Sequence, residues 1–120
     1  AGKIPFDFSS WAEDYHDAHN WAFPVFHSRG YYANTMGIDP ELQARLDDMI
    51  IEARTEPDQA RRNEIYYELQ RINFEEALML PLVELSEKIY MRSWVQNFTY
   101  NSAYPNNYYF WHYSKQGATN

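Results

Sequence analysis

Cysteine is absent from this chain of 120 residues, and several other class-defining features are missing with it. Without cysteine there is no disulfide framework, no thiol catalysis and no thiolate metal site. No run of 18 apolar residues occurs, so the sequence predicts no membrane-spanning helix. No apolar segment follows residues 1–5, so no signal peptide is visible, and we expect an exported form to have its amino terminus upstream.

Positive charge is also scarce, because 10 Lys and Arg stand against 17 Asp and Glu, for a net charge of -7. Binding to nucleic acid or to an anionic membrane needs a basic surface, so the charge argues against both partners. It is compatible with a cationic or amine-bearing ligand. The motifs G-x-S-x-G, H-E-x-x-H, the P-loop and G-x-G-x-x-G are missing too. We therefore expect neither enzymatic activity nor a cofactor.

Aromatic residues are abundant, with 11 Tyr, 7 Phe and 4 Trp. Such side chains fill cores, and they also line ligand clefts because they combine a rigid apolar face with a polar edge. Residues 12–37 are rich in them but show no clear period. We expect a long structured loop there, with one helical turn near residues 21–27.

Two amphipathic helices are predicted next. The first begins at Asp39-Pro40-Glu41, where an N-cap acceptor precedes a proline and an acid. The second is expected to begin at residues 55–58 with Pro57 in its first turn, and to fade near residues 77–80. Apolar residues recur at helical spacing along both helices: Leu42, Leu46, Met49, Ile50 and Ala53 in the first, then Ile65, Leu69 and Ile72, with Tyr66 beside them.

About five short strands are predicted around this helical pair, which makes the fold class α/β. They are expected near residues 6–8, 80–83, 88–91, 94–100 and 108–111, with a turn at 104–107 and a polar tail at 114–120. Strands scattered on both sides of two helices are a poor recipe for a self-contained layered domain. We therefore expect the chain to be a segment of a larger fold, and its unpaired strand edges predict self-association of the isolated segment.

The densest group of polar and aromatic side chains lies in residues 11–21. His16 and His19 stand three positions apart with acids nearby, a set that suits zinc or nickel. Such pairs are frequent by chance and no further ligand follows downstream, so we expect no metal site. Glu13, Asp14 and Asp17 leave open a small secreted hydrolase that uses paired carboxylates.

The same region resembles the family-5 extracellular solute-binding proteins of ABC transporters, the peptide/nickel class. The similarity begins with Phe6-Asp7-Phe8 and Trp11-Ala12-Glu13-Asp14-Tyr15-His16-Asp17-Ala18-His19-Asn20, close to the family pattern W-x-x-D-Y-P-D-P-x-N-F. It continues in order through Asp39-Pro40-Glu41-Leu42, Gln70-Arg71-Ile72, Leu80-Pro81-Leu82 and Arg92-Ser93-Trp94-Val95-Gln96-Asn97-Phe98. The chain departs from the pattern where His16 and Ala18 replace prolines, Trp21 replaces phenylalanine and Asn97 replaces glycine.

This resemblance implies a carboxy-terminal fragment of a two-lobed type II periplasmic-binding-protein fold. Residues 1–80 would end the second lobe, residues 81–113 would return toward the first, and residues 114–120 would form the tail. The parent protein would capture a solute, most simply a peptide, at the periplasmic or extracellular face of the cytoplasmic membrane and deliver it to an ABC-transporter permease. A metal chelate or an oligosaccharide is the alternative cargo.

Within this family the aspartate of W-x-x-D pairs with the free α-amino group of a peptide ligand, and that position is Asp14 here. A carboxylate in a dry cleft gives a charge-assisted hydrogen bond to an ammonium group. Trp11 and Tyr15 would wall the cleft. Two alternatives stay open from the residues themselves: Asp14 caps a turn, and Trp11 and Tyr15 pack in the core.

Overall fold

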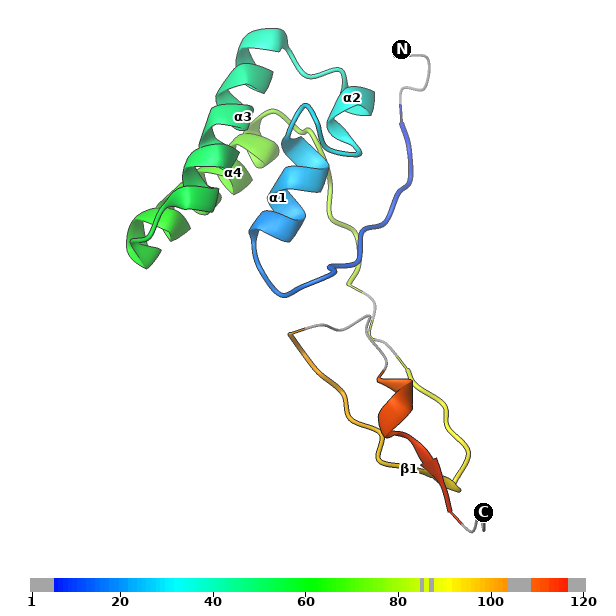
Figure 1. Ribbon diagram of the computed structural model, residues 1–120. Coiled ribbons are helices and arrows are strands. Elements are labelled where there is room, and N and C mark those ends of the chain that lie inside the picture. The colour runs from blue at the N-terminus through cyan, green and yellow to red at the C-terminus, as the bar shows by residue number, and fades with distance from the viewer. Residues whose placement is uncertain (1–5, 85, 87, 104–108, 117–120) are drawn as a thin grey trace.

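The computed structural model describes residues 6–84, 86, 88–103 and 109–116. Four helices occupy the first two thirds of the chain: α1 (His19–Phe26), α2 (Ala33–Met36), α3 (Pro40–Thr55) and α4 (Gln59–Glu75). The remainder is an extended arm with a two-stranded sheet and a short 3-10 helix. Figure 1 shows the helices at one end of the molecule and the arm at the other.

Helix α3 begins as the sequence predicts. The Asp39 carboxylate accepts hydrogen bonds from the backbone N–H groups of Glu41 and Leu42 at 2.9 and 3.3 Å, and Pro40 occupies the first turn. These bonds satisfy N–H groups that have no partner within the helix. The helix therefore starts at a position set by local chemistry alone.

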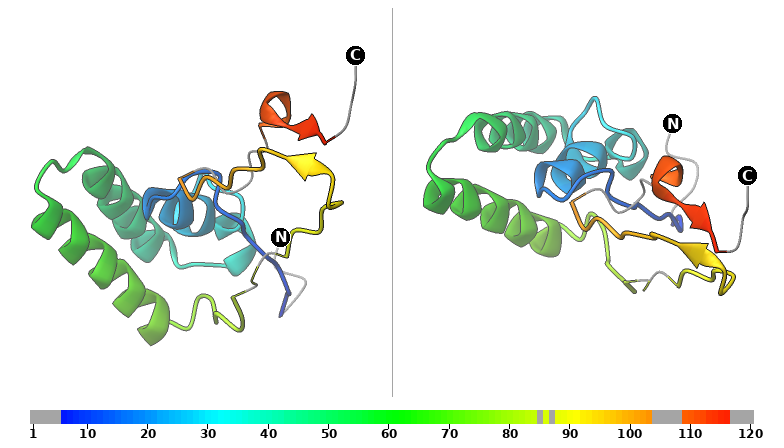
Figure 2. Two further views of the ribbon diagram at one scale, coloured as in Figure 1. Left: turned by 90° about the horizontal axis from the view of Figure 1, so that it is seen from below. Right: turned by 60° about the horizontal axis from the view of Figure 1, so that its bottom comes forward.

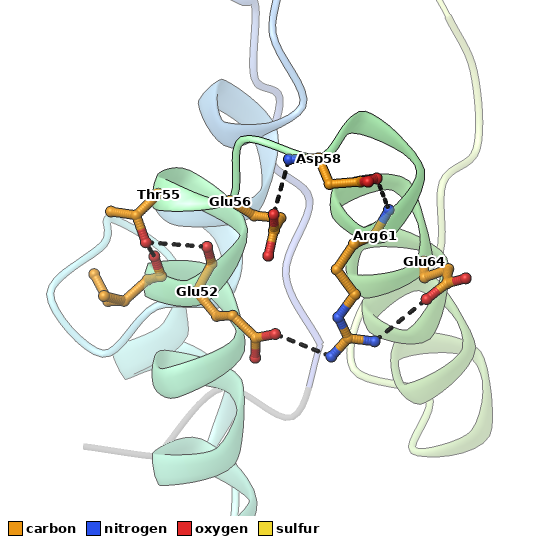
Figure 3. Close-up of polar contacts among 7 residues, drawn as sticks. Glu52, Thr55, Glu56, Asp58, Arg61 and Glu64 are labelled. Atoms are coloured by element: carbon orange, nitrogen blue, oxygen red, sulfur yellow. Dashed lines mark hydrogen bonds and ion pairs between the residues drawn. The ribbon is translucent and has the colours of Figure 1, made fainter.

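The turn between α3 and α4 is held by side chains from both sides (Figure 3). Glu56 accepts the N–H of Asp58 at 2.8 Å, and Asp58 in turn accepts the N–H groups of Ala60 and Arg61 at 2.8 and 2.9 Å. Asp58 is thus the N-cap of α4. Pro57 lies before the helix, so its predicted place in the first turn is wrong, because the capping acceptor is Asp58, the residue that follows Pro57.

The core lies between α3, α4 and α1. Helices α3 and α4 lie side by side and run in opposite directions in all views (Figures 1 and 2). The two predicted apolar stripes face each other there, which confirms the amphipathic pair. Its buried members, with Ala22 of α1, are Leu46, Ile50, Ala53, Ile65, Tyr66, Leu69 and Ile72. Leu42 and Met49 are half-buried against this cluster.

Residues 12–37 contain more helix than predicted, because α1 spans two turns and α2 follows it. The bend after α1 is tight. The carbonyl of Pro24 accepts the N–H groups of both Tyr31 and Tyr32, at 2.8 and 3.0 Å. At Gly30 a Cβ atom would lie 2.3 Å from the Phe23 carbonyl oxygen, so only glycine fits this close approach.

The predicted strands are largely wrong. Among the described residues only β1 (Val95–Gln96) and β2 (Ser114–Lys115) pair, antiparallel, with Val95 opposite Lys115. Residues 6–8, 80–83 and 88–91 are neither helical nor paired in a sheet, and β2 falls in the expected polar tail. The last predicted strand gives way to the 3-10 helix η1 (Phe110–His112), and the predicted turn at 104–107 lies outside the described residues. Alternation of side chains predicts a pleated backbone, whereas a strand also needs a neighbour to bond.

The fold class therefore holds in its coarse form, as a mixed helical chain with one small sheet. The described residues show neither two lobes nor five strands. The molecule measures 64 × 39 × 21 Å, and its radius of gyration is 19.3 Å. A compact domain of this length would have a radius of gyration of about 14 Å. No helix in the described part of the chain has the length and apolar character needed to cross a membrane.

Candidate functional site

Asn20 organises the segment that carries the predicted ligand-binding residues. Its side-chain oxygen accepts the backbone N–H of Asp14 at 2.9 Å, and its backbone carbonyl accepts the indole N–H of Trp11 at 2.8 Å. That carbonyl is free because Pro24, four residues further along α1, has no N–H to donate to it. Through these two hydrogen bonds, buried Asn20 ties both ends of residues 11–14 to the first turn of α1.

A second anchor joins this segment to the helical pair through Asp17 and Arg62. The Asp17 carboxylate lies 2.7 Å from Nη2 of Arg62, and it also accepts the N–H of His19 at 2.7 Å. Arg62 donates a further hydrogen bond, at 3.0 Å, to the carbonyl of Ala53 at the end of α3. One guanidinium therefore holds the loop before α1, the end of α3 and the start of α4 together.

The electrostatics of this anchor favour its charged form. Partial burial acts to raise the pKa of Asp17, but hydrogen bonds from Arg62 and from the His19 N–H outweigh it, so the pKa is lowered. The hydrogen bond to Asp17 likewise raises the pKa of Arg62. Both groups are thus ionised around neutral pH.

An open pocket of about 400 Å³ lies between the segment and the first turns of α4. Its walls include Glu13, Trp21, Arg62 and Tyr66. The carboxylate of Glu13 accepts the indole N–H of Trp21 at 2.9 Å and contacts Nδ1 of His16 at 2.9 Å. Both hydrogen bonds lower the pKa of Glu13, and the one with His16 has the larger effect.

These pKa directions bear on the hydrolase alternative. A glycosidase-type general acid must hold its proton near neutral pH, which requires a raised pKa. Glu13 and Asp17 both show the opposite direction. Neither carboxylate has the environment of a general acid, and both are engaged in holding the segment in place.

The structure brings two of the three predicted ligand-binding residues together, since Asn20 binds both Trp11 and the backbone of Asp14. Within the described residues the Asp14 carboxylate makes no hydrogen bond or ion pair, and Asp17 rather than Asp14 accepts the N–H at the start of α1. Trp11 is half-buried with its ring edge-on to Tyr32, at 6.3 Å between centroids. Tyr15 is 39% exposed.

The predicted residues flank the pocket and do not line it. Sequence reasoning missed the three side chains that support them, namely Asn20, Trp21 and Arg62. One signal was available for Asn20: a proline four residues downstream frees its carbonyl for a side-chain donor. Nothing local marks Arg62, because its partner Asp17 is 45 residues away along the chain.

The two histidines of the metal hypothesis have different surroundings. His16 is exposed and bound to Glu13, which raises its pKa. The ring of His19 lies against Phe23 at 5.4 Å, and burial lowers its pKa. Among the described residues no three His, Asp or Glu side chains form a group that could hold a metal ion.

Comparisons with family models, with curated proteins and with solved structures find no match for this chain. The resemblance to solute-binding proteins therefore rests on the collinear residues quoted above.

Proposed function

We propose that this chain is the carboxy-terminal part of a solute-binding protein of an ABC transporter, and that Asp14 binds the α-amino group of a peptide ligand. The protein captures its ligand outside the cytoplasmic membrane and passes it to the permease. It acts by binding and catalyses no reaction.

One observation carries this proposal: the carboxylate of Asp14 is exposed while its backbone is held. Asn20 binds the Asp14 N–H, and the Asp17–Arg62 pair holds the residues that follow. A carboxylate that served only to cap a turn would accept a nearby N–H, and in the described residues Asp14 accepts none. A positioned carboxylate without a partner is suited to an external cation.

The surroundings of Asp14 support a ligand of mixed character. Trp11 and Tyr15 belong to the same segment as Asp14, Tyr15 is partly exposed, and aromatic surface of this kind contacts the apolar parts of a peptide. When the ammonium group of the peptide loses water, it requires a partner, because an unpaired buried charge is strongly disfavoured. Asp14 would supply that partner through a charge-assisted hydrogen bond.

The test is a calorimetric double-mutant cycle in the full-length protein. Removing one member of a buried charge pair costs about 2–5 kcal/mol, so Asp14→Ala should weaken peptide binding by roughly thirty-fold or more. Acetylating the amino group of the peptide should weaken its binding to the unaltered protein by the same factor. The two losses should not add, since both remove the same contact.

Asp48→Ala is the matched control, because Asp48 is an exposed aspartate on α3 with no partner in the described part of the chain. It should leave peptide affinity unchanged. Additive losses, or equal behaviour of the two variants, would contradict the role of Asp14. A metal chelate or an oligosaccharide that binds where peptides do not would show the alternative cargo. Chemically altered ligand after incubation would show a hydrolase.

A further inference from the structure

Helix α1 contains a proline in its interior, because Pro24 is the sixth of its eight residues. Beyond the first turn, a proline has no N–H to donate to the carbonyl four residues earlier, and its ring crowds that carbonyl. Proline is the least favourable residue at such a position. The stability of the helix by itself therefore does not account for Pro24, and its role lies in what the altered helix can bind.

The carbonyl that Pro24 leaves without a helical donor belongs to Asn20, and it has a specific partner. It accepts the indole N–H of Trp11 at 2.8 Å, from nine residues earlier in the chain. In a regular helix the N–H of residue 24 would use this carbonyl. Pro24 therefore keeps the acceptor available for a side chain from outside the helix.

The side chain of Asn20 holds the other end of the same segment. Its Oδ1 accepts the backbone N–H of Asp14 at 2.9 Å. Asn20 is 6% exposed, and its own N–H donates to the carbonyl of Asp17 at 3.0 Å, so the residue is itself fixed. One buried residue thus binds the segment twice, at the side chain of Trp11 and at the backbone of Asp14.

The two hydrogen bonds give the Asp14 carboxylate a defined place before any ligand arrives. A hydrogen bond to an ammonium group weakens steeply when the donor and acceptor are misaligned. A segment that is already ordered also loses less conformational freedom on binding, which strengthens association. Selectivity for a free amine should therefore depend on the two hydrogen bonds as well as on the carboxylate.

We propose that Asn20 and Pro24 are positioning residues for amine recognition. Asn20 acts through its side chain on the backbone of Asp14. Pro24 acts by leaving the Asn20 carbonyl to the indole of Trp11. This inference rests on the proposed binding of a peptide amine by Asp14, and neither positioning residue needs to touch the peptide.

Amine selectivity in the full-length protein is the measurement that tests this role. It is the Kd of amino-acetylated trialanine divided by the Kd of trialanine, both from calorimetry. A variant that only unfolds more easily weakens the binding of both peptides alike, so the loss cancels in the ratio. Asn20→Ala should lower the ratio by roughly five- to ten-fold, because one positioning hydrogen bond is lost. Asn20→Asp keeps an acceptor for the Asp14 N–H and should retain most of the selectivity.

Pro24→Ala tests the second hydrogen bond. It supplies an N–H that competes with the indole of Trp11 for the Asn20 carbonyl, and it should lower the ratio by roughly two- to five-fold. Two controls match these variants. Ile50→Val loosens the core without touching the segment, and Pro40→Ala replaces a proline in the first turn of α3, where no helical N–H is needed. Both should leave the ratio unchanged.

The outcomes separate this inference from the proposed function. If Asp14→Ala abolishes the selectivity and Asn20→Ala retains it in full, the positioning role is overturned and the proposed function stands. Equal affinity of the unaltered protein for both peptides, or no binding of either, would overturn the proposed function and the positioning role together. An unchanged ratio for Pro24→Ala would overturn the role of that residue. A fall for Ile50→Val as large as that for Asn20→Ala would overturn the role of Asn20, since any loosening of the fold would then suffice.

Discussion

Replacing Arg62 by alanine tests how the candidate site is held in place. This side chain is 19% exposed, and its carboxylate partner on Asp17 is 32% exposed. The substitution removes the ion pair at 2.7 Å and two hydrogen bonds, to the Ala53 carbonyl at 3.0 Å and to the Tyr66 hydroxyl at 3.3 Å. It also removes the contact of the guanidinium with the face of the Tyr66 ring, at 5.1 Å from the ring centroid. It also leaves a half-buried carboxylate without its cation.

The expected loss in the free energy of unfolding on Arg62→Ala lies between two limits. Exposed ion pairs are worth about 0–1 kcal/mol, and breaking a buried pair costs about 3–5 kcal/mol. Arg62 is intermediate in burial and loses two hydrogen bonds, each worth about 1 kcal/mol. We therefore expect a loss of about 2–3 kcal/mol in the free energy of unfolding. For a chain of this length that lowers Tm by roughly 8–12 °C.

Arg61→Ala is a stringent control because it changes the neighbouring residue of the same helix. Arg61 is 53% exposed and binds Glu52 and Glu64 at 2.9 and 3.3 Å (Figure 3). Both substitutions alter helix propensity equally, so this contribution cancels in the comparison. The ion pairs of Arg61 are exposed to solvent and screened by it, so Arg61→Ala should leave Tm close to that of the unaltered chain.

Thermal and urea unfolding followed by circular dichroism measure both variants. Asp17→Asn keeps an acceptor for the His19 N–H and removes only the charge, so a cycle with Arg62→Ala isolates the pair. We expect a coupling energy of about 1–2 kcal/mol. Equal losses for Arg61→Ala and Arg62→Ala, or a coupling energy near zero, would refute the view that this pair anchors the segment.

Two further predictions concern α1 and its surroundings. Burial, with Arg54 and Arg62 nearby, lowers the pKa of His19 below its ordinary value of 6.5, so the unfolded chain takes up the proton at a higher pH than the folded chain. The contribution of neutral His19 to the free energy of unfolding should therefore be full above pH 6.5 and should be lost as the pH falls through the pKa of the folded state. His19→Gln should remove this part of the slope in urea titrations at pH 7 and pH 5, and an unchanged slope would contradict it. Gly30→Ala should cost about 1–3 kcal/mol, because its Cβ would meet the Phe23 carbonyl oxygen at 2.3 Å; a Tm equal to that of the unaltered chain would show that the bend can open.

The helical pair could be predicted from the sequence because its determinants are local. Asp39 and Pro40 mark the start of α3 within three residues, and the spacing of Leu46, Ile50 and Ala53 defines the buried face. The strands could not be predicted in the same way. Alternating residues such as those at 88–91 are compatible with a pleated backbone, but pairing depends on a neighbour that lies far away in the sequence or in another chain.

The candidate site, like the fold, was predictable from the sequence only in part. Composition and spacing by themselves determined that residues 11–21 carry a concentrated set of acids, imidazoles and aromatic rings, and that Asp14 follows Trp11 by three. Only the tertiary structure decided which of these side chains are engaged and which are left free. The Asp17 carboxylate binds Arg62, which lies 45 residues further along the chain, and the Glu13 carboxylate binds the indole of Trp21. The Asp14 carboxylate is exposed, and its backbone N–H is bound by Asn20. The reason is physical: a charge is satisfied by what lies within about 3 Å of it, and sequence distance does not set that separation.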